Sequence, residues 1–169
     1  MKTIKPPKFL PKSKPFDKKL EWAGTIALGF SWGFSLYVFA VYFGDLPQHF
    51  DAARKPDSYG NKIAVLALPL VATLLFIGMN RLNRYPEIFN YPVKITDRNR
   101  ESEYRAAMRT IRGMKLAIVL AFLLIVLDIY ITDHTADSSA NFWLLPGFLL
   151  LSFAPLIIYF ATAKKRIKP

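Results

Sequence analysis

The chain has 169 residues, of which 53% are hydrophobic and 15% aromatic, and its formal net charge is +11. Apolar runs separated by dense charge are typical of bilayer proteins, because charged groups are expelled from hydrocarbon while apolar runs are held in it. The lysines and arginines flank these runs instead of forming one stripe, which argues against a nucleic-acid partner. The chain has no cysteine, which excludes disulfides and thiolate chemistry.

A basic segment opens the chain, with seven lysines and four prolines in residues 1–19. Such a segment buries no core and proline interrupts a regular helix, so we expect residues 1–20 to form a disordered cytoplasmic tail. No small-residue cleavage site follows a short apolar region. The first apolar run is therefore expected to be an uncleaved anchor and not a signal peptide.

Four apolar runs follow, each about 17 to 25 residues long, which suffices at 1.5 Å per residue to cross about 30 Å of hydrocarbon. They are continuously apolar and do not alternate, so they favour helices over a barrel. The predicted fold is all-α. It is a single four-helix transmembrane bundle over residues 21–163, with helices at about 21–43, 62–81, 113–131 and 141–163.

Positive charge predicts the topology, because lysines and arginines stay on the cytoplasmic side. Twenty of the 23 lie in the N-terminal tail, in Arg81–Lys115 and in the basic C-terminal tail 164–169. We therefore expect both termini and the inner loop 82–112 to be cytoplasmic, with outer loops 44–61 and 132–140. The predicted location is the inner (cytoplasmic) membrane of a bacterium, crossed several times.

Small residues recur on the first predicted helix at Thr25, Gly29 and Gly33. Small side chains at four-residue spacing let helix backbones approach closely in lipid. We expect this face to pack inside the chain's own bundle. A homodimer or a partner subunit is the alternative.

The first outer loop carries His49, Asp51 and Asp57, whose side chains are of metal-binding types. No spacing motif supports a zinc site, so we expect neither a metal nor a cofactor. The structural interpretation is a compact turn in which Asp51 or Asp57 caps backbone amides and Pro56 sets the turn. The remaining groups that could complete a metal site are Asp133, His134 and Asp137.

The segment LPQHFDAARKPDSYGNK, followed by an apolar helix and then RYPEIFNYPVKIT, resembles the bacterial domain of unknown function sixteen forty-eight. That domain forms the N-terminal part of SdpI-type immunity proteins. The similarity covers about residues 22–130 and is best over Leu46–Thr96, although Arg54 stands where the family usually has glycine. The matching positions are Pro47, His49, Phe50, Asp51, Pro56, Asp57, Tyr59, Gly60, Asn61 and Lys62.

The resemblance implies a membrane fold and an immunity-like role, in which the outer face binds an extracytoplasmic ligand such as a membrane-active peptide. SdpI-type proteins are longer, with further membrane helices. The expected ligand-binding residues are Pro47, His49, Phe50, Asp51, Pro56, Asp57, Tyr59, Gly60 and Lys62.

The inner loop contains an amphipathic segment after Thr96 or Asp97, either of which can cap a helix. We expect this segment to continue the third helix and its arginines to contact anionic lipid headgroups, each contributing about 1 kcal/mol. The alternative is docking of a cytoplasmic partner, for example a transcription factor held at the membrane, as the resemblance suggests. The lipid-binding candidates are Arg98, Arg105, Arg109 and Arg112.

No phosphate-cradling glycine loop, paired nucleophile or acidic pair is evident, so we expect no enzyme activity. Asp128 could move protons or ions, but its interfacial neighbours Thr132 and Asp133 favour a residue at headgroup level. The leading hypothesis is therefore a binding or protection protein. The alternatives are an accessory or structural subunit of a larger membrane complex and, third, a small transporter.

Overall fold

The computed structural model describes residues 9–51, 56–134 and 144–167. Within them the fold is helical, as predicted, apart from one short hairpin that was not expected. The first three helices are long and apolar enough to cross a membrane. The elements are α1 (Pro15–Val41), β1 (Asp45–Phe50), β2 (Pro56–Asn61), α2 (Ala64–Leu82), the 3₁₀ turn η1 (Pro86–Ile88), α3 (Arg100–His134) and α4 (Leu144–Ile167).

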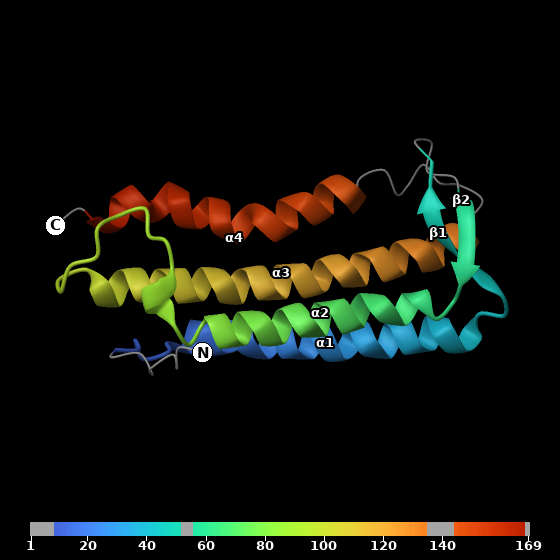
Figure 1. Cartoon of the computed structure of the whole chain (residues 1–169), viewed down its shortest axis with the longest axis horizontal. Coiled ribbons are helices and arrows are strands. Elements are labelled where there is room, and N and C mark those ends of the chain that lie inside the picture. The colour runs from blue at the N-terminus through green and yellow to red at the C-terminus, as the bar shows by residue number, and fades with distance from the viewer. Residues whose placement is uncertain (1–8, 52–55, 135–143, 168–169) are drawn as a thin grey trace, which may run out of the picture.

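The four helices lie side by side, and consecutive helices run in opposite directions (Figure 1). The start of α1, the connection from α2 to α3 and the end of α4 lie at one end, which we call the inner end. The hairpin lies at the opposite, outer end. Helix α3 packs against each of the other three helices, and α1 also packs against α2. The architecture is thus a three-helix core with α4 placed on the far side of α3 (Figure 1).

Helix α1 begins at Pro15, six residues before the predicted start, so residues 15–20 belong to the helix and not to the predicted disordered tail. Proline is tolerated at the first position of a helix, where its missing amide has no partner to lose. The Asp17 carboxylate accepts a hydrogen bond from the Lys14 backbone amide at 2.8 Å, an interaction of the kind found in a capping box. At the other end Gly44, with φ of 119°, turns the chain into β1.

Helix α3 is one continuous helix of 35 residues and begins 13 residues before the predicted membrane segment 113–131. The Thr96 amide donates to Asn99 Oδ1 at 2.7 Å just before the helix starts. At 1.5 Å per residue the helix is about 50 Å long, which exceeds a hydrocarbon core of about 30 Å. The helical continuation predicted from the inner-loop sequence is therefore present.

The connection between α2 and α3 packs through aromatic rings. Tyr91 stacks on Tyr104 with ring centroids 5.5 Å apart, and its hydroxyl donates to the Pro86 carbonyl at 2.8 Å. Burial raises the pKa of the Tyr91 hydroxyl above its ordinary value, so the group remains a donor at physiological pH. These contacts hold η1 beside the first turns of α3.

Two apolar clusters hold the rest of the core. The cluster near the hairpin joins α1, β1, α2 and α3 through Val38, Leu46, Val65 and Val126, and the middle cluster joins α2 and α3 through Ala72, Phe76 and Val119. Beside the middle cluster Trp32 Nε1 donates to Thr73 Oγ1 at 2.9 Å, which ties α1 to α2. Interhelical hydrogen bonds of this kind are common in membrane bundles.

The predicted packing face of α1 was wrong within this chain. A Cβ atom added at Gly29 or Gly33 meets nothing within 4 Å, so neither glycine is needed for a close contact here, and Thr25 is exposed. The packed face instead carries Gly24, where a Cβ atom would lie 3.1 Å from the Phe76 ring. It continues with residues that are fully buried, Ser31 and Ser35.

We predict that Gly24→Leu destabilises the protein while Gly29→Leu does not. The new side chain at position 24 overlaps Phe76 and forces α1 away from α2, at a cost of about 1–3 kcal/mol. Thermal unfolding of both variants in mild detergent measures the difference. Equal unfolding temperatures would contradict the assigned packing face.

Candidate functional site

The hairpin at the outer end is anchored to the helices. Its strands pair antiparallel, with Asp45 opposite Asn61 and Pro47 opposite Tyr59, and a register shift follows Pro47. Leu46 is 2% exposed and belongs to the apolar cluster at the outer end. At the base of the hairpin Lys62 Nζ donates to the Tyr42 carbonyl at 2.8 Å and lies 4.8 Å from the centre of the Phe39 ring.

All nine predicted ligand-binding residues lie in or beside this hairpin, which gathers them on one short ribbon. Asp51, Asp57 and Tyr59 are exposed, Pro47 is buried, and the remaining described side chains are partly buried. The side chains of His49 and Phe50 and the whole of Arg54 lie outside the described residues. At the entry to α2, Asn61 Oδ1 accepts a hydrogen bond from the Ile63 backbone amide at 2.9 Å. No capping role was predicted for Asn61.

A metal site was not expected, and the described residues contain no group of three histidine, cysteine or acidic side chains that could hold a metal ion. The second outer loop, with Asp137 and the side chains of Asp133 and His134, lies outside that description.

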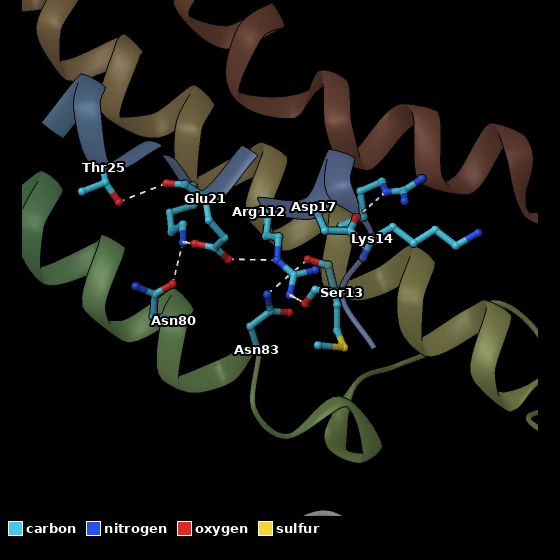
Figure 2. A network of polar contacts seen from close by, with 11 residues as sticks. Ser13, Lys14, Asp17, Glu21, Thr25, Asn80, Asn83 and Arg112 are labelled. Carbon is cyan, nitrogen blue, oxygen red and sulfur yellow. Dashed lines mark hydrogen bonds and ion pairs between the residues drawn. The ribbon is translucent and has the colours of Figure 1, made fainter. Parts of the chain in front are cut away.

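A second group of residues, made of charged and polar side chains, lies at the inner end between α1, α2 and α3 (Figure 2). The Glu21 carboxylate accepts from Arg112 Nε at 2.9 Å and also pairs with Lys115 Nζ. Lys115, which is 1% exposed, donates to Asn80 Oδ1 and lies 4.2 Å from the centre of the Phe76 ring. We call Asp17, Glu21, Asn80, Arg109, Arg112 and Lys115 the inner polar cluster.

A second ion pair in this cluster, nearer the start of α1, joins Arg109 and Asp17. Arg109 Nε donates to Asp17 Oδ1 at 2.8 Å, and Asp17 is 1% exposed. The Arg109 guanidinium also lies 5.1 Å from the centre of the Phe16 ring. Asp17 thus caps the start of α1 and fixes that start to α3.

A cavity of about 350 Å³ adjoins the inner polar cluster. This volume lies within the range of small-molecule sites, about 300–1,000 Å³. Polar groups from three segments converge on it. Its lining comprises Leu10, Pro11, Ser13, Glu21, Asn80, Asn83, Arg84, Met108 and Arg112.

The four arginines predicted to contact lipid differ in their surroundings. Arg98 is exposed, and Arg105 pairs with exposed Glu101 one turn earlier. Arg109 is 39% exposed and pairs with Asp17. The prediction was wrong for Arg112, because its side chain is buried and pairs with Glu21 instead of facing lipid headgroups.

Asp128 lies near the outer end of α3 and is 9% exposed. Its side chain is therefore buried within the protein, and its position at headgroup level stays a prediction.

Glu21, Asn80 and Lys115 were missed as site residues because each lies at the margin of an apolar run, where a polar residue is expected. A signal was nevertheless present. Asp17 and Glu21 are four residues apart on α1, while Arg109, Arg112 and Lys115 follow at three-residue spacing on α3. Complementary charges at helical spacing on two helices indicate interhelical pairing.

The fold is that of an α-helical chain with three helices suited to span a membrane, an outer hairpin and an inner polar cluster. The chain is similar to an uncharacterized protein of Archaeoglobus fulgidus, with 26% identity over 149 residues and 80% of each chain covered. No family model and no solved structure matches the chain.

We predict that Glu21→Gln lowers stability strongly while Glu101→Gln has little effect. Removing the Glu21 charge leaves Lys115 buried without its carboxylate, a change that costs on the order of 3 kcal/mol. The pair of Glu101 and Arg105 is more exposed and contributes less than about 1 kcal/mol. Unfolding of both variants in mild detergent tests this prediction. Equal stabilities would show that the ion pairs of Glu21 do not stabilise the protein.

Proposed function

We propose that the chain is an integral protein of the cytoplasmic membrane that crosses the bilayer four times, with both termini and the inner loop in the cytoplasm. The alternating helix directions support this arrangement (Figure 1). The segments richest in lysine and arginine belong to the inner end, as the preference of positive residues for the cytoplasm requires.

The absence of native cysteine allows a direct test of this topology with single introduced cysteines. We predict that Ser58→Cys, on the exposed hairpin, reacts with a membrane-impermeant maleimide in intact cells. Lys94→Cys, exposed in the inner connection, should react only after permeabilisation. The reverse labelling pattern would show that the chain has the opposite orientation. Equal labelling of the two cysteines in intact cells would refute the proposed topology.

We further propose that the protein is non-enzymatic and binds or protects against an extracytoplasmic ligand such as a membrane-active peptide. The observation that carries this proposal is the anchored hairpin, whose position is fixed by the burial of Leu46. In a two-stranded ribbon each strand has one outer edge, and an extended peptide can add to such an edge through main-chain hydrogen bonds. The resemblance to SdpI-type immunity proteins, a prediction from the sequence that no family model matches, implies the same kind of role.

Tyr59 is the sharpest probe of this proposal, since it is 58% exposed on β2 and carries a large ring suited to a peptide contact. We predict that cells lacking the gene become more sensitive to membrane-active peptides. The wild-type gene should restore resistance and Tyr59→Ala should not. The control Ile63→Ala, equally exposed but outside the hairpin, should restore it.

Unchanged sensitivity of the deletion strain to every peptide tested, with no peptide recovered on the purified protein, would refute the protective role. Loss of resistance by both variants would instead indicate a general loss of folded protein, which immunoblotting of membranes detects.

An accessory subunit of a membrane complex is the second candidate, and the exposed face of α1 favours it. Trp22, Ile26 and Phe30 point away from the rest of the chain beside Gly29 and Gly33. A partner helix could approach closely there. Co-purification of one partner after mild solubilisation, abolished by Gly29→Leu, would favour this function over peptide binding.

A further inference from the structure

The cavity beside the inner polar cluster carries more positive than negative charge. Arg112 and Lys115 share the single carboxylate of Glu21, and Asp17 is engaged by Arg109. Arg84 adds a further cation to the wall of the cavity. Arg112 and Lys115 are buried and have one carboxylate between them, and buried charge is costly unless it is compensated, so this arrangement favours an anion in the cavity.

Asn83, which lines the same cavity, has an unused acceptor. Asn83 is 7% exposed and its Nδ2 atom donates to the Met108 carbonyl at 3.2 Å, which fixes the orientation of the amide. Its Oδ1 atom is buried and accepts no hydrogen bond from the residues that the structure describes. A buried acceptor left unsatisfied costs about 1–3 kcal/mol, so this atom favours a ligand that carries a donor.

Figure 2 shows Asn83 beside the Arg112 guanidinium, with Ser13 close by. Arg112 directs Nη2 toward Ser13 Oγ at 3.5 Å, a long contact. A guanidinium is well shaped to bind phosphate oxygens through two parallel N–H groups.

We propose that this cavity binds a phosphate ester whose substituent carries an N–H or O–H donor. The phosphate accepts hydrogen bonds from Arg112 and Arg84, and the substituent donates to Asn83 Oδ1. Two sources provide this chemistry, the headgroup of a phospholipid in the inner leaflet and a soluble phosphomonoester. The site is separate from the hairpin and lies at the opposite end of the helices.

The lipid arm of the test compares phosphatidylethanolamine with phosphatidylcholine of the same acyl chains. Both carry the phosphate, but the quaternary ammonium of choline has no N–H donor. Native mass spectrometry of the full chain released from nanodiscs that contain both lipids measures which is retained. We expect phosphatidylethanolamine to be preferred by about fivefold or more, the effect of one buried hydrogen bond.

The variants separate the two contacts. Asn83→Leu should abolish the preference for ethanolamine, and Arg84→Gln should weaken retention of both lipids by about two- to fivefold, since Arg84 is exposed. Arg81→Gln is the matched control, because it removes the same charge from the same end of α2 but Arg81 does not line the cavity. Retention by this control should be unchanged.

The soluble arm titrates phosphoethanolamine and phosphocholine into the delipidated full chain by calorimetry. A preference for the ethanolamine compound in the lipid arm alone identifies a membrane lipid as the source. The same preference in the soluble arm identifies a soluble ester. If the two headgroups bind equally in both arms, and neither Asn83→Leu nor Arg84→Gln changes binding, the proposal is overturned.

Discussion

A lysine ammonium that is 1% exposed requires partners, and Lys115 finds them on two different helices. Glu21 comes from α1, while Asn80 and the Phe76 ring come from α2. Because an isolated charge in a low-dielectric surrounding costs several kcal/mol, these three helices cannot separate at the inner end without exposing or stranding it. Gly24 permits the close approach, since a side chain there would meet Phe76.

The two ends of the molecule are therefore stabilised by different kinds of interaction. At the outer end an apolar cluster joins the helices to Leu46 at the base of the hairpin, and packing there is tolerant of which apolar side chains meet. At the inner end directional ion pairs and hydrogen bonds fix α1 against α3 through Asp17 and Glu21. The directional contacts determine how α1 meets α3, while the apolar cluster provides a rigid base for the ribbon.

Apolar length predicted the helices well, because a bilayer admits few other ways to satisfy the backbone. The errors have local causes. Pro15 was treated as a helix breaker, although it occupies the first helical turn, where proline is tolerated. The hairpin was missed because its six-residue strands contain proline and glycine and show no clear alternation. The predicted ligand-binding residues all lie in or beside the hairpin, and their binding role stays a prediction. The inner cluster joins residues 94 apart in sequence, and the charge spacing indicates that two helices pair without specifying which residues meet.

The surplus of positive charge at the inner end also bears on stability. Buried Arg112 and Lys115 share the one carboxylate of Glu21, so one buried positive charge raises the free energy of the folded state by repulsion and desolvation. A bound phosphate would reverse this term, and any ligand that binds only the folded state stabilises it in proportion to its concentration relative to its dissociation constant. A chain with this arrangement gains stability when a ligand occupies the cavity at its inner end. The packing of α1, α2 and α3 is therefore coupled to the occupancy of the cavity.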